Sequence, residues 1–274
     1  MTKERFLDVL ALLIALGGLM IAAWVSDDVF ERIPHIEDEF AYLWQAEVMA
    51  QGKISQPSPE TPRAFPVPFV VDHDGQRFAK YPPGWPAALS IGARVNIPWF
   101  VNSLLAGLSL WFIYRLGTKI LGRGVGLLAE FLTLSSPMFL MLSGSLLSHT
   151  LSLCLALVFQ LAWLDSFPLR GVLREQRAPD GLALITGAGS LGLLALTRPL
   201  TAVAVATPFA LHGIYLLARG KPGEKRKLLI LALVTSVVAS LLLIWQWALG
   251  GSPFRNLYTL WWPYDSLGFG PDIG

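Results

Sequence analysis

The chain has 274 residues, of which 54% are hydrophobic and only 15% are charged. This composition, with a mean hydropathy of +0.54, lies outside the usual range of soluble domains. The net charge is only +2 and no basic stripe with interleaved aromatic residues is present, so we expect no nucleic-acid partner. The composition predicts a membrane protein surrounded by the lipid bilayer.

Long apolar stretches predict an all-α polytopic fold with about seven transmembrane helices. A helix needs about 20 apolar residues to cross a hydrocarbon core roughly 30 Å thick. Most of the 21 Lys and Arg residues fall on one side if the N-terminus is cytoplasmic, as is usual for cytoplasmic loops, so we expect the N-terminus inside and the C-terminus outside. The predicted spans are Phe6 to Val25, Trp99 to Leu116, Val125 to Leu142, Ser148 to Leu164, Gly181 to Thr197, Thr201 to Ala218 and Leu228 to Leu249.

The longest connection, residues 26–98, is predicted to be an external loop with structure of its own. Apolar residues at helical spacing between Pro34 and Gly52 predict an amphipathic helix on the membrane surface. Alternating apolar and polar residues around Asp74-Gly75 predict a hairpin. A second surface helix is expected further on, beginning no earlier than Pro86.

The domain prediction follows from these elements. Residues 1–249 are expected to form one transmembrane module, and residues 250–274 to be the start of a further external loop that is truncated. Asp265 and Asp272 lie in this Gly-rich segment, and we expect them to belong to a loop that covers a site.

Three adjacent carboxylates, Glu37, Asp38 and Glu39, open the first surface helix. One interpretation is capping, because a carboxylate in the first turn of a helix stabilises it by about 0.3 to 1 kcal/mol. The other is catalysis, because a carboxylate placed where an acceptor and a membrane-borne donor meet can act as a general base. The sequence leaves both interpretations open.

Two basic residues are candidates for binding a lipid phosphate. Lys80 precedes a rigid turn at the outer interface, where an ammonium group can hold a phosphate, although a solvated lysine is the ordinary alternative. Arg198 lies between two predicted spans with almost no loop around it. Its guanidinium is therefore expected to fold into the bundle or to extend to the membrane surface.

Other titratable residues receive smaller roles. His149 begins a predicted span and is expected to be a hydrogen-bonded wall residue, and Tyr42 on the first surface helix is a second wall candidate. No further His lies at ligand spacing, so we predict no metal site and no cofactor. Asp8 and Glu130 are expected near the cytoplasmic ends of their spans, within reach of water.

Taken together, these features resemble a known family. The stretches DEFAYLWQAEVMAQGKI, KYPPGWPAALS, LWFIYRLGTKILGRGVGLLAE and SLLSHTLSL, in this order and with this topology, are similar to the conserved module of the GT-C glycosyltransferases. The closest likeness is to the bacterial branch related to protein O-mannosyltransferases and lipid A aminoarabinose transferases. This chain departs from that pattern by placing Tyr81 between Lys80 and the two prolines.

The resemblance implies a function and roles. It implies a polyprenyl-phosphate-sugar donor in the cytoplasmic (inner) membrane, with Asp38 as base, Glu39 as its runner-up and Lys80 on the donor phosphate. The acceptor is left open between a protein hydroxyl, lipid A and another glycolipid. The alternative function is a flippase or transporter of polyprenyl-linked saccharides, which needs the same phosphate contacts but no base.

Overall fold

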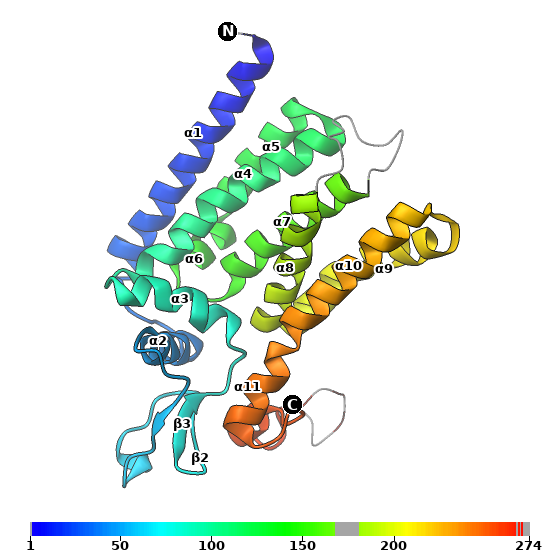
Figure 1. Cartoon of the computed structure of the whole chain (residues 1–274). Coiled ribbons are helices and arrows are strands. Elements are labelled where there is room, and N and C mark those ends of the chain that lie inside the picture. Colours follow the sequence, from blue (N-terminus) through cyan, green and yellow to red (C-terminus); the bar gives the residue numbers. More distant parts are fainter. Residues whose placement is uncertain (1, 168–180, 267, 269, 271–274) are drawn as a thin grey trace.

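The computed structural model describes residues 2–167, 181–266, 268 and 270. A bundle of helices runs along the molecule and carries two further helices and a small sheet at one end, which we call the sheet end (Figure 1). The bundle helices are α1 (Lys3–Trp24), α4 (Val101–Leu121), α5 (Arg123–Leu134), α6 (Pro137–Gly144), α7 (His149–Ser166), α8 (Gly181–Thr197), α9 (Pro199–Arg219), α10 (Pro222–Ala239) and α11 (Leu241–Gly250). The sheet end holds α2 (Glu37–Ala50), α3 (Gly84–Arg94), β1 (Gln56–Pro57), β2 (Val70–His73) and β3 (Gln76–Ala79).

The membrane-crossing capacity of the helices agrees only in part with the predicted seven spans. In the described part of the chain, five segments are long and apolar enough to cross a membrane: Lys3–Val29, Pro98–Leu121, His149–Ser166, Pro199–Arg219 and Pro222–Gly250. A sixth is possible if α5 and α6 count as one span, and α8 is apolar but has only 17 residues. These helices indicate a membrane protein, and the count of seven is not confirmed.

The predicted span from Val125 to Leu142 is divided into two helices. Its two halves, α5 and α6, are bent by 66° at the break between them. The physical reason is Pro137, which lacks the N–H that a continuous helix would use and disfavours helical geometry in the residue before it. Ser136 is accordingly extended and caps the new helix by accepting a hydrogen bond from the Phe139 N–H.

The sheet shows that the protein is mostly helical rather than all-α. Its strands run in the order β1-β3-β2, all antiparallel. The predicted hairpin is confirmed, with β2 and β3 joined by Asp74 and Gly75 at φ values of 49° and 73°. Two positive φ values in a two-residue connection match the twist of paired strands, which explains why Asp-Gly stands there.

Both surface helices form, with one difference at a boundary. The first covers Glu37–Ala50, close to the predicted range. The second begins at Gly84, ahead of Pro86, because a proline is tolerated in the first turn, where its missing N–H has no partner within the helix. A Cβ at Gly84 would lie 2.7 Å from the backbone of Leu196, so glycine allows α3 to pack directly on the end of α8.

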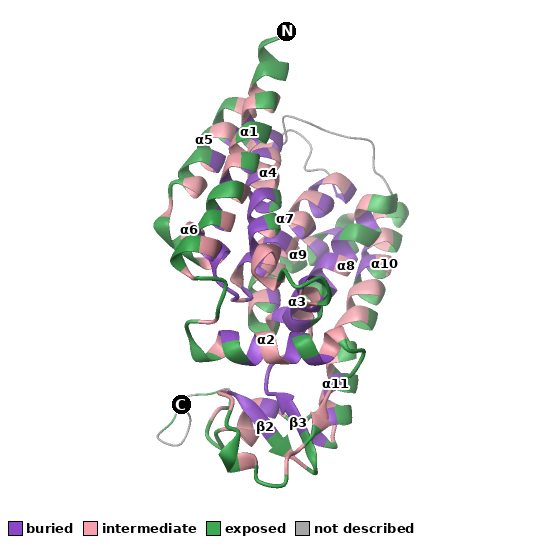
Figure 2. Cartoon of the chain, turned by 90° about the vertical axis from the view of Figure 1, so that its left-hand side faces the viewer, coloured by how far each residue is buried: buried purple, intermediate pink, exposed green. Residues whose placement is uncertain are grey.

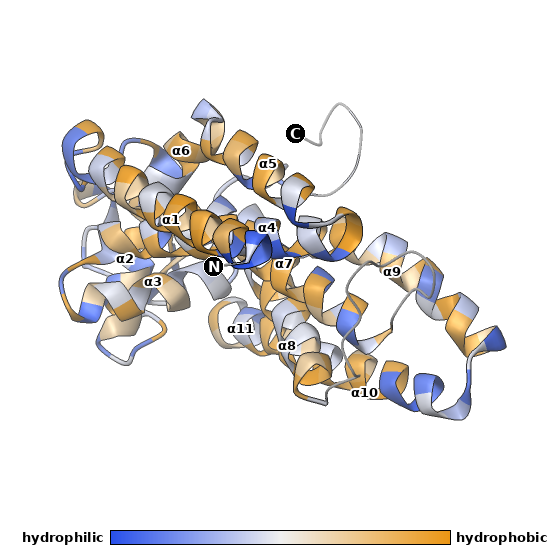
Figure 3. Cartoon of the chain, turned by 90° about the horizontal axis from the view of Figure 1, so that it is seen from above, coloured by the Kyte–Doolittle hydropathy of each residue, from blue (hydrophilic) through white to orange (hydrophobic). Residues whose placement is uncertain are grey.

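Burial separates the interior of the bundle from its apolar exterior. Buried residues gather along α4, α7 and α8, and on the inner side of α2 and the sheet (Figure 2). Large apolar side chains are nevertheless exposed on α1, α9 and α10, among them Met20, Leu211 and Leu233. Hydrophobic residues predominate along α1 and α9 (Figure 3). An exterior of this kind suits lipid rather than water.

Glu130 differs from its prediction. We expected it to reach water, but it is fully buried in α5, and neither carboxyl oxygen has a hydrogen-bond partner in the described structure. Asp8 does lie at the end of α1 away from the sheet, where it accepts hydrogen bonds from Tyr114 and Arg123. The sequence indicates that Glu130 lies near the end of its helix. It does not reveal that this side chain points into the interior of the bundle.

Candidate functional site

A pocket of about 860 Å³ at the sheet end brings together four of the predicted site residues, Asp38, Tyr42, Lys80 and Arg198. They come from α2, from the segment after β3 and from the junction of α8 with α9. Further lining residues come from α11 and from the segment that follows it, and include Trp245, Gln246, Asn256, Tyr258, Trp262 and Asp265. Residues far apart in the sequence therefore form one polar site beside an apolar bundle.

Asp38 lies in the first turn of α2 and faces this pocket. Its Oδ1 accepts a hydrogen bond of 2.5 Å from the hydroxyl of Tyr81. Burial, followed by this bond to a carboxylate, raises the pKa of Tyr81 well above its usual value, so the phenol remains a donor at neutral pH. No other hydrogen bond to the Asp38 carboxylate occurs in the described residues, which leaves Oδ2 available to a ligand.

Glu39 has a structural role, unlike its neighbour. Its Oε2 accepts hydrogen bonds from the backbone N–H groups of His35 and Ile36, at 2.7 and 3.3 Å. Its Oε1 accepts from the N–H of Leu146, at 2.7 Å. The side chain is 3% exposed and does not line the pocket. The capping interpretation therefore fits Glu39, while the pocket position fits Asp38.

The turn before α7, residues 145–148, is fixed by hydrogen bonds from three helices. The Leu146 N–H donates to Glu39 in α2, and the indole N–H of Trp85 in α3 donates to the Leu146 carbonyl at 2.7 Å. The Asn102 amide in α4 donates to the carbonyls of Ser145 and Leu147, at 2.7 and 2.8 Å. Because the turn is fixed to α2, α3 and α4, the start of α7 has a defined position beside the pocket.

Lys80 is buried rather than solvated, with only 4% exposure. It follows β3, whose last N–H is held by the buried side chain of Gln45 in α2. The Lys80 ammonium lies 4.0 Å from the ring centre of Phe69 and 4.6 Å from that of Trp262. Its one carboxylate partner in the described residues is Asp265, at 3.2 Å. The aromatic faces stabilise the cation in place of water.

Arg198 lies at the break between α8 and α9. Pro199 disfavours helical geometry in the residue before it, and Arg198 has φ −145° and ψ 89°, outside the helical region. The guanidinium Nη1 donates to His149 Nε2 at 3.1 Å and lies 3.4 Å from Ser148 Oγ. No carboxylate forms an ion pair with Arg198 in the described part of the chain, so its charge is available to an anion.

The two predicted wall residues support the charged groups. His149 must accept the hydrogen bond from Arg198, because a guanidinium only donates. It stands behind Arg198 and does not itself line the pocket. Tyr42 does line it and is 7% exposed, and burial raises the pKa of Tyr42 to about 12. Its ring lies 4.5 Å from that of Tyr81, centre to centre.

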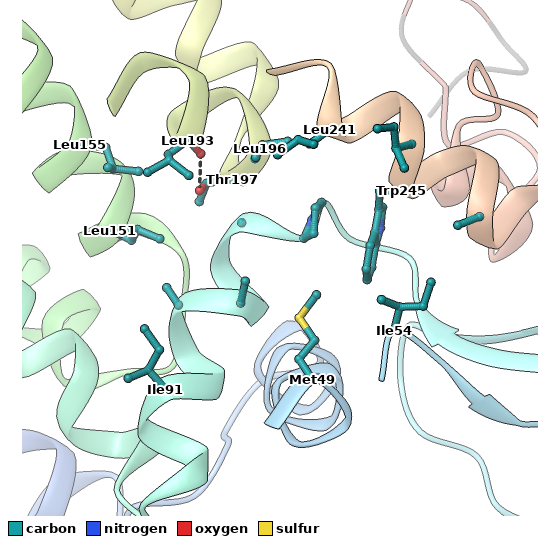
Figure 4. Close-up of a pocket in the computed structure, with 16 residues that line it drawn as sticks. Met49, Ile54, Ile91, Leu151, Leu155, Leu193, Leu196, Thr197, Leu241 and Trp245 are labelled. Atoms are coloured by element: carbon teal, nitrogen blue, oxygen red, sulfur yellow. Dashed lines mark hydrogen bonds between the residues drawn. The ribbon is translucent and has the colours of Figure 1, made fainter. Parts of the chain in front are cut away.

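An apolar groove of about 560 Å³ adjoins the polar pocket. The two share Thr197 and Trp245 as lining residues. Side chains from α3, α7, α8 and α11 turn into the groove, together with Met49 from α2 and Ile54 from the segment after it (Figure 4). This arrangement can hold a hydrocarbon chain next to a charged headgroup site.

Sequence reasoning missed Tyr81 and the aromatic groups around Lys80. Tyr81 was noted only as a departure from a family pattern, although its hydroxyl holds Asp38. The WWPY motif near the C-terminus was the available signal, since Trp262 belongs to this motif and covers Lys80. Asp265 lies over the pocket as expected, whereas Asp272 lies outside the described residues.

Comparison with protein-family models, with curated proteins and with solved structures found no match to this chain. The site is therefore interpreted from its own chemistry. Among the described residues, no group of three or more His, Cys, Asp and Glu side chains could hold a metal ion. The charged residues that line the pocket are two cations, Lys80 and Arg198, and two carboxylates, Asp38 and Asp265, of which Asp265 is paired with Lys80.

Proposed function

We propose that this protein is a membrane glycosyltransferase that moves a sugar from a polyprenyl-phosphate donor to an acceptor hydroxyl. The observation that carries the proposal is the single pocket that combines Asp38, Lys80 and Arg198 and adjoins an apolar groove. A donor of this class has a long hydrocarbon tail, a phosphate and a sugar, and the groove and pocket offer complementary surroundings for each. Its acceptor is left open between a protein, lipid A and another glycolipid.

The proposed mechanism is a direct displacement. The free oxygen of Asp38 accepts the proton of the acceptor hydroxyl while the hydroxyl oxygen attacks the anomeric carbon. The bond from the anomeric carbon to the phosphate oxygen breaks, and its electron pair leaves with the phosphate. Lys80 and Arg198 neutralise the departing phosphate, so no metal is required by the proposal. Attack opposite the leaving group inverts the anomeric carbon.

The proposed location is the cytoplasmic (inner) membrane, with the sheet end on its outer side. The excess of Lys and Arg at the opposite ends of the predicted spans supports this orientation. The exposed apolar side chains of α1, α9 and α10 would then face lipid. A donor in the outer leaflet could reach the groove from the side.

Native mass spectrometry of the detergent-purified protein with undecaprenyl phosphate tests the donor site. We expect Lys80→Ala and Arg198→Gln each to weaken binding about ten- to a hundredfold, because hydrogen bonds to charged groups contribute about 1.5 to 3 kcal/mol. Arg94→Gln is the matched control, since Arg94 is exposed at the end of α3 and lines neither cavity. Absence of binding to the wild type, or binding retained in both pocket variants, would contradict the proposal.

A further inference from the structure

The Lys80 ammonium lines the pocket but already has a partner in the arrangement that the structure shows. Its side chain is 4% exposed, and the ring centres of Phe69, Trp262, Tyr258 and Tyr81 lie 4.0, 4.6, 5.0 and 5.6 Å from the nitrogen. The ammonium donates a hydrogen bond to the carboxylate of Asp265 at 3.2 Å. A phosphate that binds Lys80 therefore competes with this carboxylate.

Three of the groups around the Lys80 ammonium belong to one segment, residues 252–266, which we call the C-terminal strap. It supplies Asp265 together with the rings of Tyr258 and Trp262. The Asn256 amide donates to the backbone carbonyl of Asp265 at 2.9 Å and so fixes the strap in its bent shape. Contacts between Phe69 and Trp262, with ring centres 5.3 Å apart, hold the strap against the sheet end.

We propose that Asp265 is a resident counter-ion of Lys80, which the phosphoryl group of the ligand displaces when the C-terminal strap moves aside. This proposal rests on the proposed function and names what its ligand must replace. A phosphate monoester, such as the polyprenyl phosphate released in the proposed reaction, carries three acceptor oxygens and a charge of about −1.5 to −2, whereas a carboxylate has two oxygens and one charge. It can also contact Arg198 in the same pocket, whereas no ion pair joins Asp265 to Arg198 in the described residues.

The exchange has a simple energetic basis. A ligand shifts an equilibrium between two arrangements only through its different affinity for each. The closed arrangement keeps the Lys80 charge neutralised and shielded from water when no ligand is bound, which avoids an unpaired buried cation. The bound arrangement gives both cations an anionic partner. The resident ion pair therefore lowers the apparent affinity for phosphate, in proportion to the fraction of molecules that are open.

The test compares Asp265→Asn with the wild type, by titration with undecaprenyl phosphate in detergent and, separately, with inorganic phosphate. If the ion pair leaves about a tenth of the molecules open, the variant should bind about tenfold more tightly. Asp265→Glu should return the affinity toward that of the wild type, because it restores the charge. Asp74→Asn is the control, since it removes the same charge from an exposed position at the hairpin tip.

Each outcome bears on the proposal. Tighter binding of either probe by Asp265→Asn supports it, and the probe that shows the effect identifies a lipid headgroup or a free phosphate as the source of the anion. Equal or weaker binding by the variant overturns the proposed exchange but leaves the proposed function in place. Asp265 would then only stabilise the buried Lys80 ammonium among its aromatic neighbours. If neither protein binds either probe, the proposed function fails as well. A melting curve shows that the variant is folded.

Discussion

The neighbouring carboxylates Asp38 and Glu39 should respond in opposite ways to the loss of a charge. Glu39→Gln places an amide where three backbone N–H groups donate to a carboxylate. Whichever way the amide is turned, its NH2 group opposes at least one of these donors. Asp38→Asn keeps an oxygen for the Tyr81 hydroxyl and turns its NH2 toward the open pocket. The first change should destabilise the fold, and the second should leave its stability nearly unchanged.

The expected size follows from the lost hydrogen bonds. If the oxygen of the introduced amide stays toward the start of α2, the N–H of Leu146 loses its partner, and a buried unsatisfied donor costs about 1 to 3 kcal/mol. The two remaining bonds lose the benefit of the charge, which adds about 1 kcal/mol or more. A total of about 2 to 4 kcal/mol corresponds to a fall in Tm of about 5 °C or more, on the scale of domains of similar size.

Thermal unfolding of both variants in the same detergent, followed by tryptophan fluorescence, measures the difference. The assignment predicts a lower Tm for Glu39→Gln and an unchanged Tm for Asp38→Asn. Equal stability of the two variants would refute the division of roles between capping and site. A large loss of stability in Asp38→Asn alone would assign the capping role to Asp38 instead of Glu39.

Three further predictions concern other contacts. Tyr81→Phe removes the donor to Asp38 but keeps the ring, so the transfer rate should fall about tenfold or more with little change in KM for the donor. Gln45→Leu breaks two hydrogen bonds of a buried side chain that join α2 to the chain around the sheet, and should lower stability in thermal unfolding by about 2 to 4 kcal/mol. The Arg77 guanidinium donates two hydrogen bonds to Asp72 and holds the pKa of that carboxyl below its usual range. This pair therefore adds stability above the unfolded pKa of about 3.9, and the contribution is lost as the pH falls through the lower folded pKa.

Full activity of Tyr81→Phe would show that Asp38 needs no positioning. Gln51→Leu, at an exposed position after α2, should be neutral, and an equal effect there would discount the Gln45 contacts. For the ion pair, Asp72→Asn should reduce the difference in Tm between pH 7 and pH 3. An unchanged difference would assign the pH dependence to other carboxylates.

Local sequence signals predicted the elements of the sheet end well. The Asp74-Gly75 pair predicted the hairpin because few residues other than glycine tolerate the positive φ that such a turn needs. Pro34 and Gly52 bracketed α2 closely. The helix count was harder, since the apolar run from Val125 to Leu142 has the length of a span while Pro137 bends it by 66°.

The site was predictable only in part because its geometry depends on long-range contacts. Adjacent residues of a helix point about 100° apart, so the sequence could not decide which of Asp38 and Glu39 faces the pocket. Tyr81 reaches Asp38 across 43 positions of the chain, and Asp265 reaches Lys80 across 185. The spacing of apolar and polar residues along the sequence does not reveal contacts over such long separations. Lys80 was predicted from its rigid turn, but its burial results from rings contributed by a distant segment.

The central claim is that this pocket transfers a sugar rather than carrying a lipid across the membrane. The most direct measurement is mass spectrometry of the lipid after incubation of the purified protein with polyprenyl-phosphate hexoses and pentoses and candidate acceptors, with wild type beside Asp38→Asn. We expect the wild type to release polyprenyl phosphate and glycosylated acceptor, and Asp38→Asn to bind the donor and leave it intact. Transfer by Asp38→Asn at the rate of the wild type would contradict the role of Asp38. A wild type that moves the intact donor across proteoliposomes, without cleaving it, would contradict the claim itself.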